Sequence, residues 1–222
     1  MVLPKAKRQY PCAILVILTV RDRKRIPMNS LVLTDSGRKL EKYWQSIRKA
    51  DEVPRRGDFR LTSDIAPLMP HLVIAELDDN DLVFRLAGSG VTERQGLNIT
   101  GKRYGDFAEP MQVARAAARI IALHAAPCGF VSVHREEYQR GFAADVEVVG
   151  FPLRTDNGEG RMLVMVVTPL GTAPYSETGG RPIFMAPASR FEFIDVGQGE
   201  PDDNAIVQWA ERGALSQGKR AE

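Results

Sequence analysis

The chain has 222 residues, a formal net charge of +2, 44% hydrophobic residues and 26% charged residues. These values match an ordinary soluble globular protein and allow one sizeable core. The two cysteines, Cys12 and Cys128, lie far apart and in no paired motif. This argues against a disulfide framework or a cysteine-built metal site and indicates a reducing, cytoplasmic compartment.

The N-terminal leader is basic. Residues 1–27 hold seven Lys or Arg against one acid, so the other 195 residues carry 23 bases against 27 acids, a net charge of −4. With this net negative charge, the part of the chain after residue 27 has no general attraction for nucleic acid. The apolar run Cys12–Val20 is far shorter than the roughly 20 residues of a membrane-spanning helix, and Arg21–Arg25 follows it in place of a cleavage site. Three interpretations stay open: a surface strand or disordered arm, a true start at Met28, and peripheral attachment to anionic lipid.

An amphipathic helix is predicted over Gly37–Ala50, behind N-cap side chains at Thr34–Ser36. Four apolar side chains recur at helical spacing and form one stripe: Leu40, Tyr43, Trp44 and Ile47. We expect this stripe to contact a dimer mate or another protein wherever it is not fully buried on the sheet.

A β-hairpin is predicted next, with strands Leu72–Leu77 and Leu82–Leu86 joined by the polar turn Asp78–Asp81. A short helix at Val91–Gln95 follows. A long alanine-rich helix is predicted over Pro110–Ala126.

A second hairpin is predicted from Gly129–Tyr138 and Phe142–Leu153. The strand Arg161–Pro169 is apolar on both faces of its pleat, a pattern typical of a strand in the middle of a covered sheet. Beyond Gly171 the pattern weakens, and Ile183–Met185 and Phe191–Val196 are assigned either to an added strand or to a clasp.

These elements predict an α+β fold with a five-stranded antiparallel sheet. We expect Arg161–Pro169 to lie centrally, between the first strand and the second hairpin. Helices inserted between the second and third strands cover one face, and the N-terminal amphipathic helix covers the other. The expected domain spans residues 34–171, between a leader of residues 1–33 and a partly disordered extension of residues 172–222.

Five segments carry a resemblance to a known family. They are LEKYWQSIR (Leu40–Arg48), PRRGDF (Pro54–Phe59), LMPHLVIAEL (Leu68–Leu77), FRLAGS (Phe84–Ser89) and GLNITGK (Gly96–Lys102). With the order of elements, they resemble a bacterial family of stand-alone PAS-like proteins over roughly residues 40–170. The resemblance implies a PAS fold with a cavity between helices and sheet; it implies no particular cofactor, so the cofactor stays unknown.

In such a fold the stretch after Gly101 borders the cavity. The ligand-pocket candidates are Leu86, Tyr104, Phe107, Val131, Val133, His134, Val146 and Val148. Plain core packing is the alternative for these residues, because aromatic and β-branched side chains fill cores first. His134 is also a candidate for binding haem or a small anion, against an ordinary half-buried strand histidine.

No catalytic or metal-binding residue is predicted. His71, His124 and His134 lie on separate elements, and Ser89 lacks the Gly-x-Ser-x-Gly spacing of a nucleophile elbow. Cys128 is expected to be a buried thiol. Four carboxylates of the second hairpin alternate with arginines, which is typical of a solvated sheet face: Glu136, Glu137, Asp145 and Glu147.

We therefore expect a non-catalytic, cytoplasmic sensor or adaptor that binds a small ligand, a signalling protein partner or both, as a monomer or homodimer. We expect no specific nucleic acid partner and no transmembrane segment. The alternative is a small cone-like hydrolase or isomerase that uses the concave sheet, and a histidine and a carboxylate within hydrogen-bond reach in a deep cavity would support it. A third class is nucleic-acid binding through the leader and the first helix.

Overall fold

The computed structural model describes residues 32, 34–50, 52–78, 81–106, 116, 119–124, 126–138, 141–171, 182–186 and 188–201. The leader up to residue 31, the extension from residue 202 and residues 107–115, which include Phe107, lie outside these ranges. Val32, which the sequence analysis places in the leader, is buried in the core.

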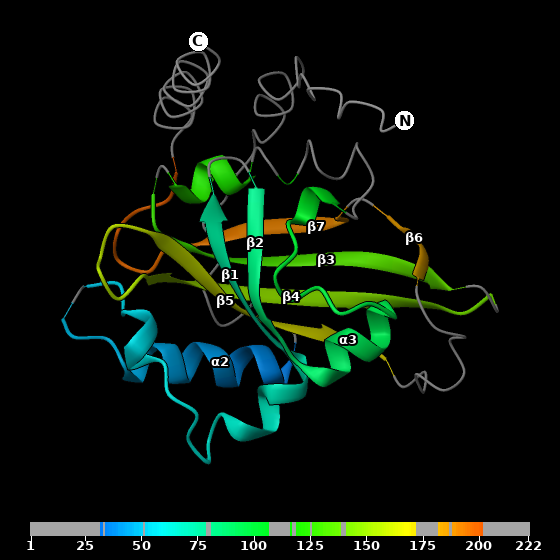
Figure 1. The fold of residues 1–222 in the computed structure, drawn as a ribbon, viewed down its shortest axis with the longest axis horizontal. Coiled ribbons are helices and arrows are strands. Elements are labelled where there is room, and N and C mark those ends of the chain that lie inside the picture. Colours follow the sequence, from blue (N-terminus) through cyan, green and yellow to red (C-terminus); the bar gives the residue numbers. More distant parts are fainter. Residues whose placement is uncertain are drawn as a thin grey trace, which may run out of the picture.

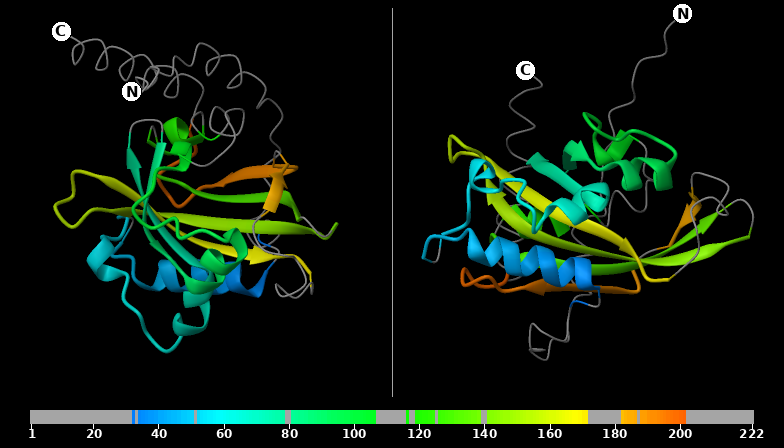
Figure 2. Two further views of the ribbon diagram at one scale, coloured as in Figure 1. Left: turned by 45° about the vertical axis from the view of Figure 1, so that its right-hand side comes forward. Right: turned by 90° about the horizontal axis from the view of Figure 1, so that it is seen from below.

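The first described helix, α2 (Asp35–Ser46), begins at the predicted N-cap. The hydroxyl oxygen of Thr34 accepts a hydrogen bond from the backbone N–H of Gly37 at 3.0 Å. The helix ends four residues before the predicted Ala50, with Ile47 as its C-cap. Trp44 lies on this helix. Its indole Nε1–H donates to the carbonyl oxygen of Pro152 at 2.7 Å, and its ring stacks on Phe151. The apolar stripe thus holds α2 along one side of the curved sheet (Figure 2).

The sheet is antiparallel throughout, and its strand order is β2-β1-β5-β4-β3-β6, with β7 also paired to β3. The strands of the described residues are labelled in Figure 1. They are β1 (Leu72–Asp78), β2 (Asp81–Ala87), β3 (Gly129–Tyr138), β4 (Ala143–Arg154), β5 (Arg161–Pro169), β6 (Pro182–Met185) and β7 (Arg190–Ile194). The central place of β5, between β1 and β4, is confirmed.

The expected number of five strands is wrong. The two further strands β6 and β7 both pair with β3, beyond the second hairpin. With four and five residues they are short, and their apolar pattern is too brief to separate a strand from a clasp.

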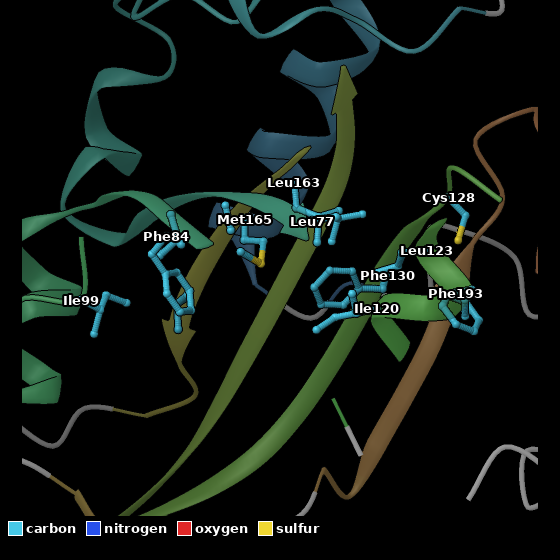
Figure 3. Packing of buried hydrophobic residues seen from close by; sticks show 14 of the residues in the cluster. Leu77, Phe84, Ile99, Ile120, Leu123, Cys128, Phe130, Leu163, Met165 and Phe193 are labelled. Carbon is cyan, nitrogen blue, oxygen red and sulfur yellow. The ribbon is translucent and has the colours of Figure 1, made fainter. Parts of the chain in front are cut away.

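Two cores lie on opposite faces of the sheet, and alternation along β5 separates them. Leu163, Met165 and Val167 belong to one, which we call the cavity-side cluster; its other members include Phe130, Ile120 and Leu123 (Figure 3). Met162, Val164 and Val166 belong to the other, the α2-side cluster, together with Leu40 and Trp44. Because successive side chains of a strand point to opposite faces, a strand apolar at every position is covered on both sides.

Short helices surround the sheet. Two 3₁₀ helices, η2 (Arg56–Asp58) and η3 (Ala66–His71), precede β1, and α3 (Ser89–Gln95) and η4 (Tyr104–Asp106) follow β2. Residues 119–124 are helical, within the helix predicted over Pro110–Ala126. The predicted start at Pro110 lies outside the described residues, and Ala126 is in a bend. None of the helices described here has the length and apolar character needed to span a membrane.

The turn from β2 into α3 requires glycine. A Cβ atom on Gly88 would come within 2.1 Å of the carbonyl oxygen of Met69 and 2.5 Å of that of Pro70. These are backbone atoms of η3, which have little freedom to move away. Ser89 is exposed and begins α3, two residues before the predicted start at Val91.

Candidate functional site

A cavity of about 290 Å³ lies on the face of the sheet that carries the cavity-side cluster. Strands β1 to β5 supply one wall, and α3, η4 and the helical residues 119–124 supply much of the other. Residues of β6 and β7 also line it. Most of the lining is aliphatic or aromatic, as at Phe84, Ile99, Ile120, Phe130 and Met165 (Figure 3).

Five polar residues that line the cavity come from two elements, α3 and β3. Ser132, His134 and Glu136 are alternate residues of β3 and therefore point to the same face of the sheet. Arg94 and Gln95 are consecutive residues at the end of α3, which packs beside η3. These five residues form a polar patch within a largely apolar lining.

Glu136 is the centre of this polar patch. Its side chain is 0% exposed, and its carboxylate accepts hydrogen bonds from Tyr138 Oη at 2.7 Å, Arg94 Nη1 at 3.3 Å and Gln95 Nε2 at 3.3 Å. His134 Nε2 lies 3.2 Å from Glu136 Oε1. Four polar side chains therefore surround one buried carboxylate, as a buried charge requires.

This environment determines the ionisation of Glu136. Burial acts to raise the pKa of the carboxyl, but the hydrogen bond from His134, the charge of Arg94 and the hydrogen bond from Tyr138 outweigh it and leave the pKa below its usual value. Glu136 is therefore an anion near neutral pH.

The ionisation of Glu136 in turn fixes the tautomer of His134. A carboxylate can only accept, so Nε2 of His134 carries the proton that lies between the two groups. The other ring nitrogen, Nδ1, is then an acceptor in the neutral imidazole and a donor in the imidazolium.

A second arginine, Arg119, also lines the cavity. Its guanidinium lies 4.0 Å over the ring of Phe191 from β7, in a cation–π contact. Tyr104 lines the cavity as well. Burial raises the pKa of its phenol, against the lowering effect of Arg119 and with a smaller raising effect of Asp81.

The structure brings three of the predicted pocket residues to the cavity: Tyr104, His134 and Val148. Val131 belongs to the α2-side cluster, because it alternates with Phe130 and Ser132 on β3. Val133 is buried and Val146 is in the cavity-side cluster, but neither lines the cavity. Phe107 lies outside the described residues.

Leu86 is on the wrong face for a pocket residue, and a β-bulge explains why. Leu86 pairs with Ile74 and Phe84 with Ala75, so Arg85 is an extra residue in β2. The bulge puts Phe84 in the cavity-side cluster and Leu86 against the α2-side cluster. Without it, the two residues would share a face.

The interface candidates divide into two pairs. Leu40 and Trp44 are fully buried within the chain, while Tyr43 and Ile47 are partly exposed. The oxygen of Tyr43 donates to the carbonyl of Arg60 at 2.6 Å and accepts from the N–H of Arg60 at 3.2 Å. Half of the stripe therefore remains on the surface of this chain.

The other candidates of the sequence do not converge. Glu136 lies on the cavity face and Glu147 is buried on the opposite face, while Glu137 and Asp145 are exposed. The interpretation of all four as one solvated face is thus wrong for the two buried residues. Cys128 is a buried thiol. Within the described ranges, no group of three or more His, Cys, Asp or Glu side chains is placed to hold a metal ion.

Sequence reasoning missed Arg94, Gln95, Ser132 and the role of Glu136. The available signal was the period of two along β3, which places Ser132 and Glu136 with His134. Nothing local pairs Glu136 with Arg94, which is 42 residues away in the chain.

A family model described as a PAS domain matches residues 32–167, a range that includes β1 to β4 and most of β5. No curated protein matches the chain.

Proposed function

Because this chain belongs to the PAS domain family, we propose that it is a non-catalytic sensory or adaptor protein that binds a small ligand in the cavity. A PAS domain indicates a sensory or signalling role in general. The cavity would be the sensing site, and a separate signalling protein in the cytoplasm would receive the signal. No specific nucleic acid is part of this proposal.

The observation that carries the proposal is the composition of the cavity wall. A largely apolar hollow with a few polar groups at one place is the usual form of a small-molecule site. At about 290 Å³ the cavity is at the small end of such sites, which typically enclose about 300–1,000 Å³.

We propose that α2 transmits the effect of ligand binding to a partner protein. A ligand shifts a conformational equilibrium only by its differential affinity for the two states. The side chain of Ser132 on β3 lines the cavity. On the neighbouring strand β4, Glu147 accepts hydrogen bonds from Thr34, the N-cap residue of α2. A movement of this hairpin would therefore act on α2, whose partly exposed Tyr43 and Ile47 are the proposed contacts to a partner or a second copy.

The ligand can be sought directly. We expect protein purified from its native host and then denatured to release a small molecule, detected by mass spectrometry, in about equal amount to the chain. The variant Ala116→Phe narrows the cavity, because Ala116 lines it, and should release much less. Equal release from both proteins, with the variant folded, would place the molecule elsewhere and count against the proposal.

The second candidate, a hydrolase or isomerase, has one observation in its favour. His134 and Glu136 lie within hydrogen-bond reach in the cavity, as an acid–base pair would. The sensor is preferred because Glu136 has four polar partners and is held as an anion, which leaves it little capacity to exchange protons. Hydrolysis of p-nitrophenyl butyrate that disappears in His134→Gln would favour the enzyme.

A further inference from the structure

Arg94 is a buried cation with unused hydrogen-bonding capacity. Its side chain is 2% exposed and lines the cavity. Among the described residues it makes one hydrogen bond, from Nη1 to Glu136 Oε2 at 3.3 Å. A guanidinium has five N–H donors, and this bond uses one of them. A ligand in the cavity that carries acceptor atoms can take hydrogen bonds from the others.

A second polar group of the cavity is available to the same ligand. Ser132 is buried and on the cavity face of β3, two residues from His134. The described residues offer its hydroxyl no hydrogen-bond partner. A hydroxyl can donate to an oxygen of a ligand.

The charges of the lining favour an anion. Arg94 and Glu136 form an ion pair, and Arg119 is a second arginine that lines the same cavity. Counted over Arg94, Arg119 and Glu136, the formal charge of the lining is +1. A cationic ligand would meet two arginines and a carboxylate that already accepts from four partners.

We propose that the cavity binds a small apolar carboxylic acid as its carboxylate. The two carboxylate oxygens would accept from the arginines and Ser132, and the hydrocarbon part would lie against Phe130, Ile120 and Met165. The inference rests on the proposed function, because it names the ligand class of the same cavity. At about 30 Å³ for each water-sized group, a volume of about 290 Å³ holds roughly ten non-hydrogen atoms. Octanoate is an acid of this size.

The test compares octanoate with octan-1-ol, its neutral counterpart, by titration calorimetry on the purified chain. We expect octanoate to bind about ten- to a hundredfold more tightly, because hydrogen bonds to charged groups are the stronger ones. This comparison needs no variant and does not depend on whether a substitution folds. If octan-1-ol binds as tightly as octanoate, the proposed recognition of the carboxylate is wrong, and the cavity is a site for apolar ligands. Octanoate failing to bind would also overturn this recognition, and the extraction experiment above would still decide the proposed function.

Two arginine variants localise the effect. Arg119→Gln should weaken octanoate about tenfold and leave octan-1-ol unchanged, since it removes a charge from the cavity lining. The matched control is Arg85→Gln, because Arg85 is exposed, pairs with Glu76 at 2.6 Å and does not line the cavity. The control should bind octanoate like the unaltered chain. Equal loss in both variants would show a general charge effect and contradict the proposed site.

Discussion

The buried carboxylate of Glu147 holds the start of α2 through Thr34. Its Oε1 accepts from the backbone N–H of Thr34 at 3.0 Å and from the Thr34 hydroxyl at 2.5 Å. The same hydroxyl oxygen accepts from the N–H of Gly37, so one residue joins the sheet to the first turn of the helix. The helix cap therefore depends on a strand 113 residues away.

Replacing Glu147 should loosen this connection. Glu147→Ala leaves two donors of Thr34 without their acceptor, and we expect a loss of about 1–3 kcal/mol in the free energy of unfolding, measured with urea. Hydrogen exchange at the α2 amides should accelerate more than exchange in β5. The control Glu137→Ala removes an exposed carboxylate from β3 and should change stability by less than about 0.5 kcal/mol. Equal effects of the two variants would contradict this role of Glu147.

Trp44 is expected to stabilise the fold from within the chain. Trp44→Ala removes the stacking on Phe151 and the hydrogen bond to Pro152, and large-to-alanine changes in cores cost about 3–5 kcal/mol. Trp44→Phe keeps a ring and should cost less, mainly for the unpaired carbonyl. A Trp44→Ala protein of unchanged stability but altered mass in light scattering would show instead that Trp44 is an interface residue.

The partly exposed residues Tyr43 and Ile47 allow a test of whether the surface of α2 forms an interface. Ile47→Asp should abolish any self-association or partner binding through α2 and leave the urea midpoint little changed, because Ile47 only borders the α2-side cluster. Arg48→Asp changes the neighbouring residue and serves as the control for the effect of an added negative charge. Retention of the oligomeric mass in Ile47→Asp, with the fold intact, would rule out this surface.

His124 predicts a dependence of stability on pH. Burial lowers the pKa of His124 to about 4, with the charge of Arg161 acting in the same direction and Asp78 opposing it. The unfolded chain binds this proton near pH 6.5 and the folded chain only near pH 4, so the contribution is present above pH 6.5 and is lost as the pH falls toward 4. The full effect is about 3 kcal/mol. Urea unfolding of His124→Gln should show a flatter slope between pH 6.5 and 5, and an unchanged slope would assign the dependence to other groups.

Gly88 should tolerate no side chain. In Gly88→Ala the new Cβ would lie 2.1 Å from a backbone oxygen of η3, so either η3 or the start of α3 must move. We expect a loss on the order of 2–4 kcal/mol, as for severe overpacking. Ser89→Ala changes an exposed neighbour and should cost well under 1 kcal/mol. A Gly88→Ala protein as stable as Ser89→Ala would contradict the close approach of the two backbones.

Much of the sheet could be predicted because its signals are local. The apolar run Met162–Val167 predicts a strand covered on both faces, and β5 lies in the middle of the sheet as expected. The polar turn Asp78–Asp81 marked the first hairpin, and Thr34 marked the start of α2. These are properties of neighbouring residues, which a sequence shows directly.

The site was harder to predict because it depends on which face each residue takes. Val133 and His134 were both predicted to line the pocket, although neighbouring residues of a strand point to opposite faces. Leu86 was predicted to line it too, but a β-bulge that no local motif indicates turns this side chain to the other face. The ion pair of Arg94 and Glu136 joins a helix and a strand far apart in sequence. Such pairs follow from the tertiary fold and cannot be read from spacing.

The most direct test is an NMR spectrum of isoleucine methyl groups with octanoate added, because isoleucines lie on both faces of the sheet. Ile99 and Ile120 line the cavity, whereas Ile65 and Ile74 belong to the α2-side cluster. The account predicts saturable shifts at Ile99 and Ile120, with Ile65 and Ile74 much less affected. Shifts confined to Ile65 and Ile74, or no saturable shift at any isoleucine, would contradict it.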